Sequence, residues 1–257
     1  MKFSQAIVRP PSTSFPEGLT QANLGVPDLE LAMQQHATYC TALEKCGLSL
    51  TRLEPDPRYP DSTFVEDTAV LTARSAILTH PGAVSRRGEV SSVEAALAQI
   101  YPSLKTIKPP GTLDGGDVCQ VENHFFIGLS ERTNESGAQQ LAELLTEDGY
   151  TASLVDIRDL DNTLHLKSGM AYLGDGCLVL TQEMETQDAF QGYEIITVDQ
   201  EESYAANCLR INDFVLIPAR HPRTEAKISK LGYTTLTLEM SEFKKMDGGL
   251  SCLSLRF

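Results

Sequence analysis

The strongest constraint on the fold is a repeated order of elements along the chain: strand, strand, helix, strand. Short apolar runs separated by turn signals alternate with amphipathic stretches of helical period. Four complete copies are predicted over residues 65–109, 117–157, 169–199 and 205–240, with helices at 89–100, 135–147, near 187 and at 224–231.

The two ends of the chain supply a fifth copy. Residues 250–257 predict one strand, while strand 3–10, helix 28–46 and strand 48–55 predict the other three elements. Joining the first and last segments in one module leaves no open sheet edge, which is how radial β architectures avoid exposed strands. We therefore expect an α/β fold of five strand-strand-helix-strand modules in a ring, forming a single domain over residues 1–257.

Equivalent positions of a radial fold gather around one end of its axis. In the predicted modules, polar and thiol side chains stand at the start of each first strand, namely Asp67, Asp114, His165, Cys208 and Cys252. Two acids, an imidazole and a thiol are therefore expected to meet near the centre of the ring.

The composition narrows the choice of ligand and compartment. With 35 acidic against 21 basic residues, the net charge of -14 disfavours nucleic acid and anionic membranes, which need clustered Lys and Arg. A small cationic ligand fits better, although acidity also serves solubility. No apolar run has the length of a secretory core or a membrane span, and no CxxC pair is present among the six cysteines. We expect a cytoplasmic protein with reduced thiols and no metal site.

Cys252 and His165 form the candidate catalytic pair. Cys252 follows a Gly-Gly turn, whereas Cys40, Cys46, Cys119, Cys177 and Cys208 have the pattern of small buried side chains. His165 opens a strand, and an imidazole suits both proton donation and abstraction near neutral pH. Asp114, before two glycines, has two open roles: it can orient His165 as the third member of a triad, or pair with a substrate cation.

Charged residues elsewhere predict a slot for an arginine-like molecule. Asp61, Glu66 and Asp67 surround Phe64 in DSTFVEDTAV, where they are either solvated acids of an edge strand or a pocket floor for a planar guanidinium. Arg86 and Arg132 lie in predicted loops, where they either cover surface or bind the carboxylate of an amino-acid substrate.

Eight segments, in order, resemble the motifs of the dimethylarginine dimethylaminohydrolase family. They are LTQANLG, DSTFVEDTAV, HPGAVSRRGE, GTLDGGDV, GLSERTN, LHLKSGMAYL, YAANC and DGGLSC. The resemblance implies the pentein fold, a five-bladed α/β propeller, which agrees with the repeat. It also implies a cofactor-free hydrolase that converts asymmetric dimethylarginine and monomethylarginine to citrulline and the methylamine.

The same resemblance implies a role for each matching residue. Cys252 is similar to the nucleophile, His165 to the general acid/base and Asp114 to the acidic third member of the catalytic group. The implied substrate-contact residues are Leu19, Asp61, Phe64, Glu66, Asp67, Arg86, Arg132 and Met246. The two arginines would receive the α-carboxylate, Asp61 and the Met246 carbonyl the α-amino group, and Asp67 the guanidinium.

Three alternatives remain open at this point. Arginine or agmatine deiminases use the same chemistry on other guanidines, and an amidinotransferase passes the group to another amine. A non-catalytic binding protein on the same propeller is the third, although it would not need a Cys, a His and an acid at matching blade positions. Homodimerisation and inhibition by zinc caught between Cys252 and His165 are also left open.

Overall fold

Five three-stranded sheets make up the framework of the protein. The computed structural model describes residues 2–160 and 163–257. In each sheet the middle strand pairs antiparallel with one neighbour and parallel with the other, and the parallel pair flanks the helix of that module. A parallel pair needs such a crossover, so the predicted strand-strand-helix-strand order is confirmed as the folding unit.

The strands fall into three groups by their place in the module. The first strands are β3 (Ala69–Leu71), β6 (Val118–Val121), β9 (Met170–Gly174), β12 (Leu209–Ile211) and β15 (Leu255–Arg256). The middle strands are β4 (Ala76–Leu78), β7 (His124–Leu129), β10 (Cys177–Thr181), β13 (Phe214–Pro218) and β1 (Gln5–Val8). The third strands are β5 (Leu104–Thr106), β8 (Thr151–Asp156), β11 (Glu194–Val198), β14 (Thr234–Leu238) and β2 (Ser49–Arg52).

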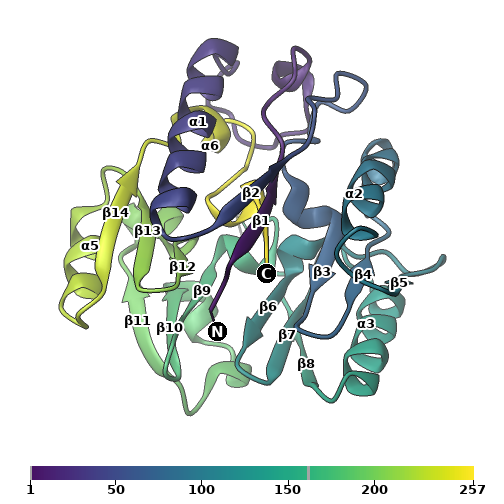
Figure 1. Ribbon diagram of the computed structural model, residues 1–257. Coiled ribbons are helices and arrows are strands. Elements are labelled where there is room, and N and C mark those ends of the chain that lie inside the picture. Colours follow the sequence, from purple (N-terminus) through teal and green to yellow (C-terminus); the bar gives the residue numbers. More distant parts are fainter. Residues whose placement is uncertain (1, 161–162) are drawn as a thin grey trace.

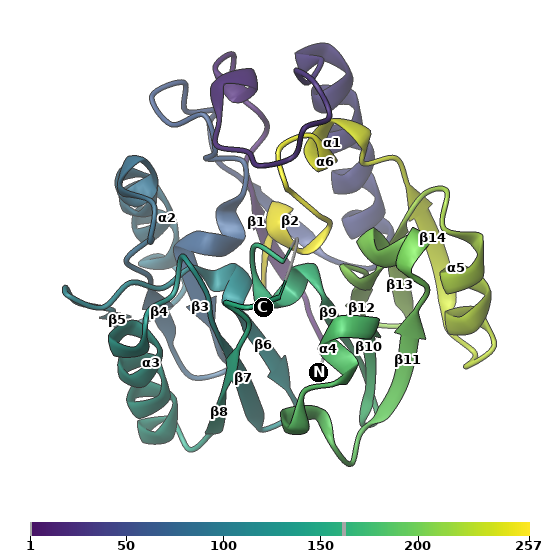
Figure 2. The ribbon, with the colours of Figure 1, turned by 180° about the vertical axis from the view of Figure 1, so that it is seen from behind.

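The sheets are arranged as a ring with the helices outside. Figures 1 and 2 show the longer helices of the modules around the periphery and the first strands toward the middle. The module helices are α2 (Val90–Leu97), α3 (Glu135–Glu147), α4 (Gln182–Glu185), α5 (Pro222–Ser229) and α1 (Leu29–Lys45). This arrangement confirms the predicted five-bladed α/β propeller.

Local signals explain where the longer helices begin. The Asp28 carboxylate accepts from the Leu31 N–H at 3.0 Å at the start of α1, and the Asn134 side chain accepts from the Gly137 N–H at 2.8 Å at the start of α3. Each cap satisfies an N–H that has no partner within the helix. The predicted bounds agree for α3 and differ by a few residues for the others.

The predicted joining of the two chain ends is confirmed. β1 pairs antiparallel with β15 and parallel with β2, so the first and last strands belong to one sheet. Both termini lie near the middle of the view in Figures 1 and 2. Within the described residues, no helix is long and apolar enough to cross a membrane.

One expectation about the strands needs correction. The predicted site residues do not open the first strands. A 3₁₀ turn precedes each of these strands, and it holds or adjoins the residue in every module except the fourth, where Cys208 lies two residues after the turn. The turns are η2 (Val65–Thr68), η4 (Gly115–Asp117), η5 (Leu166–Ser168), η7 (Gln200–Ala206) and η8 (Ser251–Leu253). A turn lets side chains project toward the axis, whereas a strand would alternate them between two faces.

A second difference concerns the fifth module. A short helix that the sequence pattern did not predict, α6 (Ser241–Lys244), lies between β14 and the turn before β15. Its Phe243 is buried and packs against Phe15 and Phe64, with ring centroids 5.6 and 6.2 Å away. This packing supports the segment that carries Met246 and the Gly-Gly turn.

Candidate active site

The 3₁₀ turns converge at one end of the ring, which we call the site end, and enclose a small pocket. Ten of the predicted site residues line it: Leu19, Asp61, Phe64, Asp67, Arg86, Asp114, Arg132, His165, Met246 and Cys252. Leu164, Asp247 and Gly248 complete the wall; each adjoins a residue that was singled out or a Gly-Gly turn, but nothing in its own pattern marked it. The pocket measures about 30 Å³. This is room for about one water molecule. The pocket shares five wall residues with a side cavity of about 310 Å³, namely Leu164, His165, Asp247, Gly248 and Cys252.

Two glycines allow the turns to approach so closely. A Cβ on Gly115 would lie 2.0 Å from the Glu66 carbonyl oxygen, and one on Gly116 would lie 2.8 Å from both Asp67 Oδ1 and His165 Nδ1. The Gly116 N–H also donates to Asp67 Oδ1 at 2.8 Å. The DGGD sequence therefore holds the neighbouring turns together, which only glycine permits at these distances.

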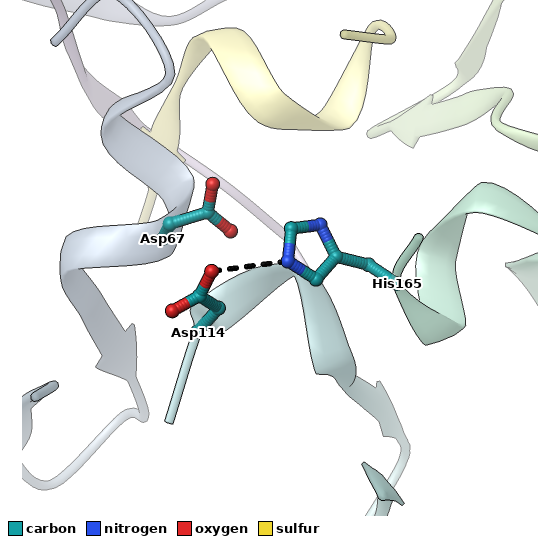
Figure 3. A group of neighbouring side chains, drawn as sticks. All are labelled: Asp67, Asp114 and His165. Carbon is teal, nitrogen blue, oxygen red and sulfur yellow. Dashed lines mark hydrogen bonds and ion pairs between the residues drawn. The ribbon is translucent and has the colours of Figure 1, made fainter. Parts of the chain in front are cut away.

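His165 and Asp114 are hydrogen-bonded. His165 Nε2 lies 3.1 Å from Asp114 Oδ2, and Asp114 Oδ1 accepts from the Gly82 N–H at 2.9 Å. Figure 3 shows the carboxylates of Asp114 and Asp67 on the same side of the imidazole ring. This contact is compatible with the first of the two roles left open for Asp114, the orientation of His165, and that role stays a prediction.

Carboxylates favour the imidazolium form of His165. Burial of the ring lowers its pKa, but the surrounding Asp67, Asp117 and Asp114 outweigh burial and raise the pKa to about 9. For Asp114, burial raises the pKa, but the hydrogen bond and charge of His165 outweigh it, so the pKa lies below its ordinary value. At neutral pH the imidazolium form of His165 is therefore favoured.

Asp117 belongs to the same DGGD sequence but has a different surrounding. Its carboxylate accepts from the hydroxyls of Ser130 and Thr133 at 2.7 and 2.6 Å and from the Leu166 N–H at 2.9 Å. Burial raises its pKa to about 6. Asp117 therefore fixes the turn after His165 and does not line the pocket.

Cys252 is the half-buried thiol of the site. Its sulfur accepts from the Gly249 N–H at 3.4 Å. Burial, together with the carboxylates of Glu66 and Asp67, raises the pKa of the thiol to about 12. The thiol is therefore protonated at neutral pH unless a cation comes close to it.

Asp67 and Arg86, predicted to contact opposite ends of the substrate, are paired with each other. Arg86 Nη1 lies 2.6 Å from Asp67 Oδ2, and Arg86 Nη2 lies 2.9 Å from a Glu89 oxygen. All three side chains are buried, so the pairing offsets the cost of desolvating the charges. Burial raises the pKa of Glu89 to about 7, so only part of the Glu89 population is charged at neutral pH.

Arg132 and Asp61 complete the charged lining. In the described part of the chain, the Arg132 guanidinium has no hydrogen bond or ion pair. The Asp61 carboxylate accepts from the Leu19 N–H at 3.1 and 3.2 Å, and burial raises its pKa. Asp61 thereby ties the segment around Leu19 to the pocket.

Glu66 differs from the other predicted contact residues because it does not line this pocket. Its carboxylate accepts from Ser251 Oγ at 2.7 Å and pairs with Lys167 at 2.6 Å and Arg256 at 3.0 Å. Glu66 thus lies behind the pocket, where it joins the segments on either side of Cys252.

The arrangement is built for a cation. Oxygen and nitrogen atoms of Asp67, Asp114 and His165 lie within 4.8 Å of one another, a grouping that could hold a metal ion (Figure 3). Asp67 already pairs with Arg86 and Asp114 with His165, however, and a thiol lies on the same pocket. Any ligand cation would share these carboxylates with Arg86 and His165.

Comparisons with known proteins agree with these features. The model of the arginine deiminase family matches residues 57–205. N(G),N(G)-dimethylarginine dimethylaminohydrolase of Pseudomonas aeruginosa is 45% identical over 256 residues, covering 99% of this chain and 100% of the relative. The chain belongs to the dimethylarginine dimethylaminohydrolase family.

Other members and structures extend this likeness. The dimethylarginine dimethylaminohydrolase of Streptomyces coelicolor is 34% identical, over 100% of this chain and 98% of the relative. A crystal structure of the Pseudomonas aeruginosa enzyme, a cysteine-to-serine mutant with citrulline, superposes over the full length of both chains with a TM-score of 0.97 and 44% identity. The N-terminal domain of a cyanobacterial arginine dihydrolase, 17% identical with a TM-score of 0.88, covers 100% of this chain and 97% of its own and shares the fold.

Proposed function

We propose that this protein hydrolyses asymmetric dimethylarginine and monomethylarginine to citrulline and dimethylamine or methylamine. The observation that carries the proposal is the meeting, in one acid-lined pocket, of the Cys252 thiol and the His165 imidazole held by Asp114. Membership of the dimethylarginine dimethylaminohydrolase family supports the choice of substrate.

The substrate itself activates the thiol. A thiol whose pKa is raised to about 12 is a poor nucleophile at neutral pH. A guanidinium about 4 Å away contributes roughly 4 kcal/mol at an effective dielectric near 20, which favours the thiolate by about three orders of magnitude. Binding of the cationic substrate thus places a positive charge beside Cys252, and this charge stabilises the thiolate that the nearby carboxylates disfavour.

The reaction then proceeds in two displacements. With the cation bound, the Cys252 thiol loses its proton to solvent. The thiolate attacks the guanidinium carbon, and the C–N bond breaks as the imidazolium of His165 gives its proton to the departing amine. The product of this step is a thiouronium bound to Cys252. Neutral His165 next takes a proton from water, and the resulting hydroxide adds to the same carbon. The C–S bond then breaks as the added hydroxyl loses its proton to solvent, which releases citrulline and the thiolate.

The remaining pocket residues hold the amino-acid end. In the proposed pose Arg132 and Arg86 receive the α-carboxylate, Asp61 and the Met246 carbonyl receive the α-amino group, and Asp67 receives the guanidinium beside Phe64. Arg86 already donates to two carboxylates, so Arg132 supplies the larger part of the carboxylate contact. The pocket of about 30 Å³ is smaller than this ligand, so its walls must move apart where the side cavity of about 310 Å³ does not already provide room.

Release of citrulline and of the amine tests the proposal. Wild type and Cys252→Ser are each incubated with dimethylarginine, monomethylarginine, arginine and agmatine. Citrulline with dimethylamine from the wild type alone is expected. Ammonia from arginine would instead favour a deiminase, which the match to the arginine deiminase family model makes the second candidate. No product from any of the four would overturn the proposal.

We also propose that the ring works as one catalytic domain in the cytoplasm without a cofactor. All six cysteines are unpaired, as expected in a reducing compartment. Homodimerisation stays a prediction, which the mass in solution tests.

A further inference from the structure

Asn207 joins the two turns that carry the proposed nucleophile and the proposed acid/base. Its Nδ2 donates to the Lys167 carbonyl oxygen at 2.7 Å and to Ser251 Oγ at 3.0 Å, while its Oδ1 accepts from the Ser251 N–H at 3.0 Å. Lys167 lies two residues after His165, and Ser251 directly precedes Cys252. A single buried amide therefore connects both turns.

The place of Asn207 in the ring explains why such a link is needed. His165 precedes β9 of the third module and Cys252 precedes β15 of the fifth, so the fourth module lies between them. Asn207 precedes β12 of that fourth module. No strand of the third module pairs with one of the fifth, so side chains must set the separation of the two turns.

The surrounding residues leave Asn207 little freedom. A Cβ on Gly249 would lie 2.5 Å from Asn207 Oδ1, so the Gly-Gly turn before Cys252 lets the amide approach the backbone. Ser251 Oγ in turn donates to Glu66 at 2.7 Å. The Ser251 hydroxyl that accepts from the Asn207 amide is therefore itself held by Glu66. Together these contacts fix the orientation of the amide.

We propose that Asn207 is a positioning residue that sets the separation of the Cys252 thiol from the His165 imidazole. This inference rests on the proposed function. His165 must reach the amine that leaves the carbon bound by Cys252, and later the water that attacks the same carbon. A displacement of about 1 Å between such groups can cost on the order of 100-fold in rate.

Asn207→Asp is the main test, because the chain offers a matched control. Asn212 also accepts one N–H, from Phe3, and donates twice, to the carbonyl oxygens of Phe3 and Cys46. Asn212→Asp also removes two donated bonds, but at residues that do not line the pocket. Asn207→Ala removes the bonds without adding a charge, so agreement between the two Asn207 variants excludes an effect of the new carboxylate.

We expect Asn207→Asp and Asn207→Ala to lower kcat for dimethylarginine roughly 10- to 100-fold with KM changed less than threefold. The loss should be smaller for S-methyl-L-thiocitrulline, because its thiolate leaving group needs less help from the His165 proton. Asn212→Asp should lose a similar amount of Tm and keep wild-type kcat.

Several outcomes would overturn the inference. Either both Asn207 variants retain kcat within twofold, or they lose activity equally on both substrates in proportion to a loss of folded protein measured by circular dichroism. If Asn207→Asp does not fold, the same comparison rests on Asn207→Ala. If the wild type does not hydrolyse dimethylarginine, the proposed function is overturned instead. The kcat comparison of the Asn207 variants is then made with whichever guanidine the wild type hydrolyses.

Discussion

The two ends of the ring axis differ in size and in chemistry. The site end encloses about 30 Å³ among carboxylates, arginines, an imidazole and a thiol. The opposite end opens into an axial cavity of about 590 Å³ whose walls include Val70, Val118, Phe125 and Met170. Glu66, Lys167 and Ser251 face both this cavity and a side cavity of about 310 Å³ beside Cys252, so a thin polar layer separates the two ends.

The comparison shows that the volume of a cavity in this protein does not indicate where the reactive side chains lie. Both ends hold ionisable groups with shifted pKa values. The site end brings carboxylates, arginines and an imidazole onto one small pocket, whereas the large cavity has mostly hydrocarbon walls and buried thiols such as Cys208. A reactive centre needs fixed charges at short distance in a dry surrounding, which a tight pocket supplies and a wide one does not.

The largest expected effect is a loss of activity, tested by replacing one cysteine at each end of the ring axis. Cys252→Ser should lower turnover of dimethylarginine by at least about 1,000-fold, because a hydroxyl ionises far less readily than a thiol. Cys208→Ser, which changes a buried thiol on the axial cavity, should keep activity within twofold and cost about 1–2 kcal/mol of unfolding free energy. Initial rates of citrulline formation and urea unfolding measure both. Equal loss of activity in the two variants would break the distinction between the ends.

A smaller effect is expected from one carboxylate at each end. Asp67→Asn should lower kcat/KM for dimethylarginine roughly 100-fold, because it removes the charge proposed to face the guanidinium and breaks the buried pair with Arg86. Glu122→Gln, at the axial cavity, should stay within twofold of wild type. Steady-state kinetics of both variants tests this difference. An unchanged kcat/KM for Asp67→Asn would show that Asp67 does not contribute to substrate binding.

The smallest effect is a dependence on pH that belongs to the site end alone. The pKa of His165 rises from 6.5 to about 9 on folding, so its contribution to stability is complete below pH 6.5 and disappears as the pH rises through 9. The unfolding free energy of wild type relative to His165→Gln should therefore fall by up to about 3 kcal/mol between pH 6 and pH 9.5.

The same proton governs the rate. Turnover by the wild type should decline several-fold above pH 9 as the imidazolium is lost. Urea unfolding at the two pH values measures the stability difference, and initial rates measure the activity. A difference from His165→Gln that does not vary with pH would contradict the assignment of the charge to this ring.

The module order could be predicted from the sequence because it depends on hydrophobic period. The amphipathic stretch 135–147 coincides with α3, and the apolar runs at both chain ends predicted the β15-β1-β2 sheet. Short α6 left no such signal, since its four residues span little more than one helical turn.

The direction of individual side chains could not be predicted in the same way. Cys208 was grouped with Asp67, Asp114, His165 and Cys252, yet it lines the axial cavity. A shift of one residue turns a side chain to the other face of a strand, and spacing between modules does not fix that shift.

Ion pairs and hydrogen bonds between residues far apart in the sequence could not be predicted from the sequence pattern either. Asp67 and Arg86 each resembled a substrate contact, but nothing in their segments indicated that they would pair with each other. The sequence pattern did not predict a role for Asn207, which precedes Cys208 in YAANC. Its polar side chain between apolar neighbours was the only local indication of a buried hydrogen-bonding role. Which groups meet depends on the closure of the ring, and that information is spread over the whole chain.

The sheet formed by β15, β1 and β2 has a consequence for biosynthesis. Ribosomes deliver the N-terminal segment first, so β1 leaves the exit tunnel long before residues 255–256 can pair with it. The four internal modules can assemble during translation, whereas the module with Cys252 in its turn must wait for the last strand. The module that carries Cys252 is therefore completed only after residues 255–256 have been synthesised and can pair with β1.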